Sequence, residues 1–159
     1  MKRSRVVTIA LSVLTTLAIA VPTQAAEPVN VDVFGCGVFQ GGETTVPRRT
    51  NINLRFGWAT EALRQSKKFL DSAQVYARID GVKVAQPNQY WGRPAQIGDE
   101  PGKRYWLTWW SYPAGQLARG ETLVVRFQTT LRERHWDGFR WYEAGRVFDP
   151  PLKCTITAS

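Results

Sequence analysis

Apolar and polar residues alternate with a period of two through most of the chain, which is the pattern of half-buried β-strands. The clearest case is 51–58, where Ile52, Leu54, Phe56 and Trp58 share one face. We expect that face to be core. Similar alternation predicts further strands at 29–33, 75–79, 82–84, 105–111, 123–129 and 152–156. Asp80-Gly81 is a dipeptide that favours a two-residue hairpin turn.

Three segments depart from this alternation. Residues 60–72 read as a short helical insertion, capped by Thr60 and packed through apolar residues such as Phe69. Residues 85–102 and 132–151 are rich in turn-forming residues and predict long loops, the second with room for a hairpin. Seven or so short strands at this spacing predict an all-β, antiparallel sandwich.

The hairpin at 75–84 and the stretch at 117–125, Leu-Ala-Arg-Gly-Glu-Thr-Leu-Val-Val, carry a family resemblance. They resemble secreted bacterial domains of the immunoglobulin or fibronectin type, in which a small glycine turn leads into a long strand near the end. The resemblance implies an immunoglobulin-like sandwich and no activity, because such sandwiches host many unrelated functions. Cys36 lies in the Gly-rich continuation of the first predicted strand and Cys154 lies on the last one, unlike the two cysteines of antibody domains.

The first 26 residues have the layout of a secretory signal peptide. Lys2, Arg3 and Arg5 precede an apolar stretch at 6–21, and small residues end the segment at Ala26. We expect cleavage after Ala25 or Ala26, leaving 27–159 as one secreted, extracellular domain with no transmembrane segment; an N-terminal membrane anchor is the alternative. Three of 21 basic residues and none of 13 acidic residues lie in this segment, so the formal charge would fall from +8 to +5.

An even number of cysteines in an exported chain indicates a disulfide. Cys36 and Cys154 are the only two, so one intramolecular pairing exists. It would close a loop of over a hundred residues, for which the chain-entropy model gives about 4–5 kcal/mol. Two buried free thiols are the alternative.

Motifs for catalysis, phosphate binding or calcium binding are absent from the sequence. His135 is the only histidine, and together with two cysteines it cannot supply four zinc ligands. A glycosidase would need two converging carboxyl groups, and Asp137, Glu143 and Asp149 share one loop region. Loop carboxylates are more often solvated, so we expect no enzyme, no metal and no cofactor.

Tryptophan is unusually abundant, with seven in the chain. Alternation predicts Trp58 and Trp109 in the core, and Trp106 and Trp110 on the opposite face, roughly 13–14 Å apart. Exposed indoles on a rigid strand suit the stacking of sugar rings. We therefore predict a binding site for extracellular or cell-wall polysaccharide, formed by Trp106, Trp110, Tyr90, Trp91, Arg93 and Arg104.

Two other interpretations of the aromatics remain open. Loops that cover them would form a second, minor core in which arginines stack on indoles. Alternatively, the loops at 85–102 and 132–151, which carry Trp136 and Trp141, would bind an extracellular protein, as in an inhibitor or a structural module of the cell envelope. The basic residues form only short pairs, so we expect no nucleic-acid partner. We expect a monomer.

Overall fold

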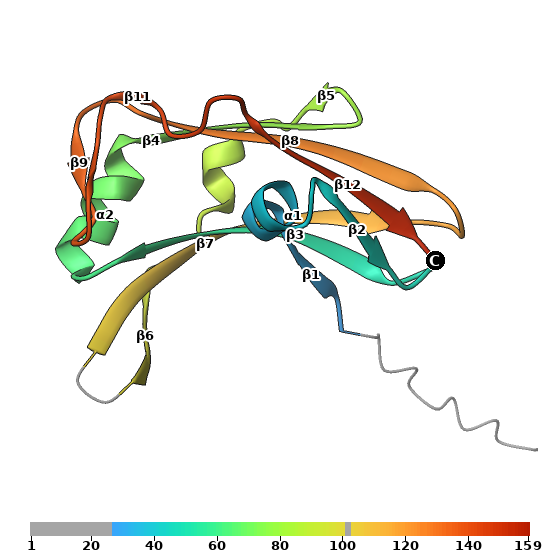
Figure 1. The fold of residues 1–159 in the computed structure, drawn as a ribbon, viewed down its shortest axis with the longest axis horizontal. Helices are drawn as coiled ribbons and strands as arrows, with labels where there is room; N and C mark the ends of the chain where they lie inside the picture. Colours follow the sequence, from blue (N-terminus) through green and yellow to red (C-terminus); the bar gives the residue numbers. More distant parts are fainter. Residues whose placement is uncertain (1–26, 101–102) are drawn as a thin grey trace, which may run out of the picture.

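The computed structural model describes residues 27–100 and 103–159, so the predicted signal peptide at 1–26 lies outside the described residues. Two β-sheets face each other with the apolar core between them (Figure 1). The first sheet has the order β1 (Val29–Asp32), β3 (Asn51–Thr60), β7 (Lys103–Gln116), β6 (Ala95–Glu100). The second has the order β2 (Glu43–Val46), β12 (Leu152–Ala158), β8 (Thr122–Leu131), β4 (Ala73–Ile79), β5 (Val82–Lys83), with β11 (Gly145–Arg146) also paired to β8. The short strands β9 (His135–Trp136) and β10 (Trp141–Tyr142) form a separate hairpin.

A two-sheet, β-rich architecture is confirmed, but the prediction of purely antiparallel sheets is wrong. β1 runs parallel to β3, and β2 runs parallel to β12. Hairpin turns force antiparallel neighbours, whereas long connections do not. The chain passes from β1 through α1 (Val33–Phe39) and β2 before it reaches β3, so both edge strands are free to pair in parallel.

The predicted strand at 29–33, together with the Gly-rich continuation that carries Cys36, is replaced after Asp32 by the helix α1 (Val33–Phe39). Asp32 caps this helix, and its carboxylate accepts a hydrogen bond of 3.0 Å from the Phe34 backbone N–H. Val33 and Cys36 are three residues apart and fall on the buried side. The predicted disulfide is confirmed: Cys36 is bonded to Cys154 of β12, 118 residues away, and ties α1 to the last strand.

The inner face of β3 and the following helix match the prediction. Ile52, Leu54, Phe56 and Trp58 are all buried. The helix α2 (Leu63–Ser72) is capped by Ala62 instead of Thr60, because the Thr60 hydroxyl is buried 2.6 Å from the Ser66 hydroxyl. Phe69 of α2 stacks on Trp58, with ring centroids 4.1 Å apart. This contact fixes the helix against the sheet.

The predicted hairpin at 75–84 is confirmed as β4 and β5. Both turn residues, Asp80 and Gly81, have positive φ angles of 48° and 81°, as a two-residue turn of the primed type requires. The segment 85–102, predicted as a loop, contains a 3-10 helix η1 (Pro87–Tyr90) and the strand β6 within its described residues. Across 27–100 and 103–159, no helix is long and apolar enough to span a bilayer.

The two faces of β7 are the reverse of the prediction. Trp110 lies opposite Phe56 in the ladder and is completely buried, and its indole N–H donates a 2.7 Å hydrogen bond to the Pro87 carbonyl. Trp109 lies opposite Gly57, on the outer face. Since directly paired residues share a face, the register with β3 decides which indole enters the core.

Gly57 makes the outer position of Trp109 possible. A Cβ at Gly57 would lie 2.8 Å from the Trp109 ring, closer than real contacts allow. The Arg55 guanidinium carbon lies 4.1 Å from the centroid of the same ring, which is a cation–π contact. A glycine and an arginine on β3 therefore hold Trp109 outside the core.

Candidate functional site

The β9–β10 hairpin sorts its four residues into two faces. Trp136 pairs with Trp141, and His135 pairs with Tyr142. The two indoles are exposed, by 37% and 53% of their surface, and their ring centroids are 5.4 Å apart with planes inclined by 46°. The His135 ring is buried and Tyr142 is half-buried. The hairpin thus presents an aromatic pair outward and a second pair inward.

The outward pair and helix α2 form a groove of about 420 Å³, here called the aromatic–basic groove. Its lining residues are Arg64, Gln65, Lys68, Trp136 and Trp141. Arg64 and Lys68 lie one helical turn apart and therefore project from the same side of α2. The groove offers two indole faces and two cationic side chains to solvent.

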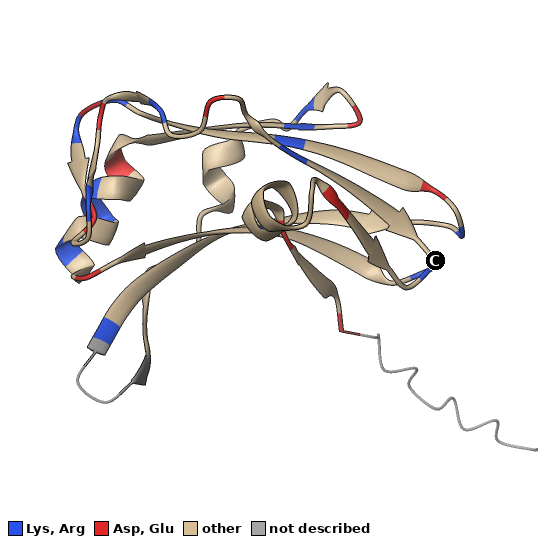
Figure 2. Cartoon of the chain, viewed as in Figure 1, with Lys and Arg blue, Asp and Glu red and all other residues tan. Residues whose placement is uncertain are grey.

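Further charges lie beside this groove, and both signs occur near α2 and β9 (Figure 2). The Arg134 guanidinium carbon is 4.3 Å from the Trp141 ring centroid and its Nε is 3.0 Å from a Glu143 carboxylate oxygen. Lys68 Nζ lies 3.5 Å from a Glu133 carboxylate oxygen. These ion pairs are more than half exposed, so their main effect is to orient the side chains around the indoles.

The hairpin is held in place at its turn. One Asp137 carboxylate oxygen accepts hydrogen bonds from the backbone N–H groups of Phe139 and Arg140, at 2.7 and 2.8 Å. The Glu61 backbone N–H donates to the Asp137 carbonyl at 2.9 Å, which ties the turn to the end of β3. Gly138 has φ of 106°, and a Cβ there would collide with the Glu61 side chain. Only glycine suits this position.

The inward pair packs into an aromatic cluster. The His135 ring lies 6.2 Å from Trp58 and 5.9 Å from Phe69, measured between centroids. Burial lowers the pKa of His135 below its usual value, and the nearby Asp137 carboxylate acts in the opposite direction. The buried imidazole is therefore neutral at pH 7. It is a packing residue of the hairpin, in a strand instead of the predicted loop.

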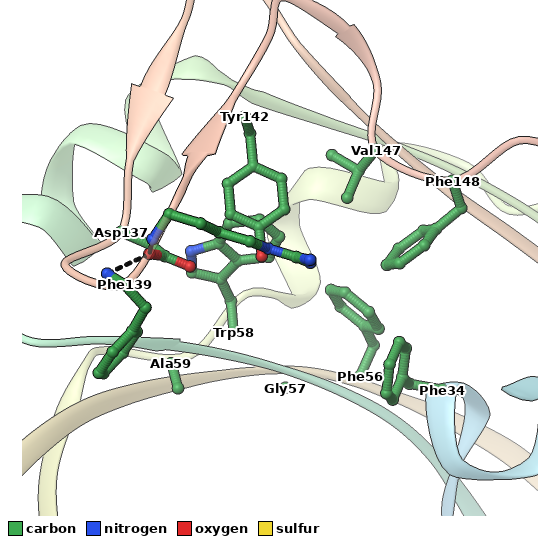
Figure 3. A pocket seen from close by; sticks show the side chains of 11 residues that line it. Phe34, Phe56, Gly57, Trp58, Ala59, Asp137, Phe139, Tyr142, Val147 and Phe148 are labelled. Atoms are coloured by element: carbon green, nitrogen blue, oxygen red, sulfur yellow. Dashed lines mark hydrogen bonds between the residues drawn. The ribbon is translucent and has the colours of Figure 1, made fainter. Parts of the chain in front are cut away.

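A second cavity, here called the aromatic pocket, lies under the hairpin, with a volume of about 210 Å³ (Figure 3). Its lining residues are Phe34, Phe56, Gly57, Trp58, Ala59, Asp137, Phe139, Arg140, Tyr142, Val147 and Phe148. The Arg140 guanidinium carbon lies 4.4 Å from the Tyr142 ring centroid. Burial raises the pKa of the Tyr142 phenol, a hydrogen bond with Arg140 opposes this, and the charge of Asp137 raises it further.

The six residues predicted as the polysaccharide site do not form one exposed surface. Trp110 is buried, and Tyr90 packs edge-on to it at 6.1 Å. Trp91 packs against the core through Phe69, at 5.2 Å between ring centroids. Trp106 is half-buried on the same side of β7 as Trp110. Arg93 and Arg104 are exposed. The predicted stacking surface is therefore largely occupied by packing.

The groove residues Arg64, Gln65 and Lys68 were not expected at a site from sequence. Arg64 and Lys68 did carry one usable signal, the four-residue spacing of cations on a helix whose opposite side is apolar. The sequence assigns Trp136 and Trp141 only to the alternative interpretation, in which the loops bind an extracellular protein. The packing of α2 against β9 brings the two sets together.

The carboxylates considered for catalysis have separate surroundings. Asp137 lines the aromatic pocket, Glu143 pairs with Arg134, and Asp149 lies 3.7 Å from Arg146. Among the described residues, no group of three His, Cys, Asp or Glu side chains is placed to hold a metal ion. Comparison of the chain with models of known protein families and with curated protein sequences finds no match.

Proposed function

We propose that this protein is an exported, non-catalytic module that binds an acidic polysaccharide in the aromatic–basic groove. The observation that carries the proposal is the pair of exposed indoles, Trp136 and Trp141, beside the cationic side chains of Arg64 and Lys68. Large exposed aromatics are costly to leave in water and mark binding surfaces when they cluster. The ligand class is the one expected from the sequence, but the binding residues are those of this groove instead of the six residues on and near β7.

The geometry suits sugar rings better than a flat apolar ligand. The indole planes are inclined by 46°, so the two rings do not form one flat surface. The puckered ring of a pyranose presents C–H groups that pack on each indole face. The side-chain amide oxygen of Gln65 (Oε1) accepts a 2.7 Å hydrogen bond from the Ala62 backbone N–H. The side-chain NH₂ group of Gln65 is then left to donate to a sugar hydroxyl.

The charge of the groove favours carboxylated or sulfated sugars. Arg64 and Lys68 line it, and none of the acidic side chains that the structure describes does so. An anionic ligand would also compete with Glu133 for Lys68, whose exposed ion pair costs little to open. Binding to an acidic glycan should therefore weaken as salt is added, because the groove is open to solvent.

Export is supported by the layout of residues 1–26 and by the disulfide, which is consistent with an oxidising compartment. The immunoglobulin-like assignment is supported by the two facing sheets, while the parallel edge strands β1 and β2 depart from that pattern. A fold of this kind suits a rigid support for binding residues and does not by itself indicate a ligand.

The test compares retention of purified protein on immobilised acidic and neutral polysaccharides. We expect Trp136→Ala/Trp141→Ala to reduce affinity by about tenfold or more, which is typical of losing central tryptophans from an interface. Phe39→Ala is the matched control, because Phe39 is an exposed aromatic, 77% accessible, on α1. Arg64→Gln/Lys68→Gln should remove the preference for acidic over neutral glycans. Equal retention of wild type and the double tryptophan variant would refute the proposal.

A protein partner is the second candidate, and one observation favours it. Phe139, in the turn of the same hairpin, is a third exposed aromatic residue, with 53% of its surface accessible. A protein interface would use all three aromatics, whereas the groove proposal does not need Phe139. Phe139→Ala should leave glycan retention unchanged if the glycan is the ligand, and loss of retention on that change would favour a broader contact.

A further inference from the structure

The outer face of the second sheet carries four cationic side chains in one line, away from the residues of the aromatic–basic groove. Arg126 of β8 pairs with Lys153 of β12 on one side and with Arg78 of β4 on the other. Arg78 in turn pairs with Lys83 of β5. These four residues, here called the cationic row, cross four adjacent strands, and their blue bands lie beside one another in Figure 2. We propose that the cationic row is a contact surface for an anionic lipid membrane.

Alternation along the strands directs these side chains to solvent. On β8, Val125 and Phe127 are buried in the core, so Arg126 between them points outward. The other three members of the row occupy equivalent positions on their strands, and all four side chains are exposed. Adjacent strands lie about 4.7–4.9 Å apart, so the row spans roughly 14–15 Å. A flat surface can therefore meet four positive charges at once.

The cationic row is unfavourable for the sheet that carries it. Like charges directly opposite each other on adjacent strands are destabilising, and none of these four cations takes part in an ion pair within the described residues. A lysine on an edge strand protects against aggregation, which accounts for Lys83 on β5. That reason does not apply to Arg126, whose strand is paired on both sides. Charges that oppose the fold indicate a partner that neutralises them.

Arg78 is held in position within the row. Its Nε donates a hydrogen bond to the Tyr76 hydroxyl, and a terminal guanidinium nitrogen donates one of 3.0 Å to the Gly81 carbonyl. Tyr76 lies two residues before Arg78, on the same outer face, and is itself exposed. Tyrosine is enriched where proteins meet the headgroup region of a bilayer, because its ring is apolar and its hydroxyl is polar. The surface beside the row therefore suits a lipid interface.

A fluid membrane fits the cationic row better than a charged polymer does. Anionic lipids diffuse laterally and gather beneath cations at any spacing, whereas a polymer carries its charges at fixed intervals. Polymers of sugars or nucleotides are also held by stacking on aromatic rings. Tyr76, the ring beside the row, is already in contact with the Arg78 guanidinium, whose carbon lies 5.6 Å from the ring centroid. The row offers charge, and it lacks the paired indoles of the groove.

Two carboxylates lie close to the row, and their positions identify its strongest part. Glu43 of β2 and Asp80 of the β4–β5 turn lie near the two ends of the neighbouring register position, about 6.6 Å along the strands. Asp80 already accepts a 2.8 Å hydrogen bond from the Val124 backbone N–H. Arg126 has only cations directly opposite it. Attraction to an anionic surface is therefore strongest at the centre of the row, where the test is directed.

The experiment measures co-sedimentation of the purified protein with lipid vesicles. Vesicles of phosphatidylglycerol and phosphatidylcholine in equal amounts are compared with vesicles of phosphatidylcholine alone. We expect binding to the mixed vesicles only, and weaker binding as salt is added. Each cation near an anionic surface contributes about fivefold to the partition coefficient, so Arg78→Gln/Arg126→Gln should lower the coefficient roughly 20- to 30-fold.

Arg48→Gln/Arg119→Gln is the matched control, because it removes the same amount of charge. Both arginines are exposed and lie in the turns after β2 and before β8, outside the row. We expect this variant to bind the mixed vesicles within about twofold of wild type, because distant exposed charges are screened. Equal losses in the two double variants would show that only net charge matters, and would overturn the proposal.

Arg126→Gln adds a second measurement, thermal stability. Removal of the cation between two others relieves repulsion, so Tm should stay level or rise, while the partition coefficient falls about fivefold. A purely structural role for Arg126 gives the opposite result, a lower Tm with unchanged vesicle binding, and that result would overturn the proposal.

Two further outcomes overturn the proposal. One is failure of the wild-type protein to bind the mixed vesicles at low salt. The other is binding to a DNA duplex or to dextran sulfate that depends on the row and is as strong as vesicle binding at equal concentration of negative charge, which would assign the row to a polymer. Trp136→Ala/Trp141→Ala should bind vesicles as wild type does, so failure of the groove and failure of the row give different results.

Discussion

Replacement of Trp110 tests the arrangement of the two sheets. The indole is completely buried, stacked near-parallel to Tyr112 at 5.9 Å and edge-on to Phe127 at 5.0 Å, and hydrogen-bonded to the Pro87 carbonyl. Removal of a fully buried tryptophan side chain costs about 3–5 kcal/mol. Loss of the hydrogen bond adds to this, because it leaves the Pro87 carbonyl without its donor. We expect Trp110→Ala to lower the free energy of unfolding by about 4–5 kcal/mol.

Trp109→Ala is the matched comparison, one residue away on the same strand. This indole lies on the outer face, half-buried, and its main visible partner is the Arg55 guanidinium. An exposed cation–π contact contributes about 0.5–1 kcal/mol, and partial burial adds a similar amount. We expect a loss of about 1–2 kcal/mol, several-fold less than for Trp110→Ala.

Urea unfolding monitored by far-UV circular dichroism measures both values. At roughly 3–5 °C per kcal/mol for a domain of this size, Trp110→Ala should lower Tm by about 12–25 °C. Alternation read from sequence predicts the opposite order, with Trp109 in the core and Trp110 at the ligand. A larger loss for Trp109→Ala than for Trp110→Ala would show that the register of β3 and β7 is wrong. Polysaccharide retention of folded Trp110→Ala should match wild type.

Three further perturbations have expected outcomes. Cys36→Ser/Cys154→Ser releases a cross-link across 118 residues and should lower the free energy of unfolding by about 5 kcal/mol, measured in urea without reductant; a loss below about 1 kcal/mol would contradict the chain-entropy account. His135 has a folded-state pKa below 6.5, so its contribution to stability is complete above pH 6.5 and is lost as pH falls through the folded pKa. Urea midpoints between pH 7 and pH 5 should therefore fall less in His135→Phe than in wild type, and parallel curves would count against this. Gly138→Ala forces a side chain into a φ of 106° and against Glu61, and should cost about 1–3 kcal/mol together with reduced polysaccharide retention; unchanged retention would place the binding site away from this hairpin.

Local patterns were sufficient wherever one face of an element is clearly apolar. β3 alternates without ambiguity, α2 combines a non-alternating stretch with a buried Phe69, and Asp80-Gly81 specifies its turn through backbone conformation alone. In each case the residues that determine the element lie within about ten positions of one another. The disulfide was also predictable, since only two cysteines are present.

Local patterns failed in β7 because both of its faces are apolar. Tyr105, Leu107 and Trp109 alternate with Trp106 and Trp110, so burial could not be assigned from the strand itself. The deciding information is the register with β3, in which Gly57 leaves room for one indole and Phe56 packs beside the other. A cross-strand register of this kind depends on residues some fifty positions away.

The helix α1 was missed for a different reason. Val33 and Cys36 suit a strand when read from Val29, and the glycines at 35 and 37 are unfavourable in a helix. The Asp32 cap and the burial of Cys36 against Cys154 outweigh this low propensity. Tertiary packing and a cross-link supply what the local sequence lacks, as is usual for short helices.

The β9–β10 hairpin explains why two cavities of different chemistry lie so close together. Its alternation sends Trp136 and Trp141 toward α2 and solvent, and His135 and Tyr142 toward Trp58. One side therefore faces cations and water, and the other faces an enclosed aromatic cluster. Side-chain changes on one face alter one cavity and leave the backbone that supports the other. A change at the turn, where Gly138 meets Glu61, acts on both, because it moves the hairpin, whose residues line the groove on one face and the pocket on the other.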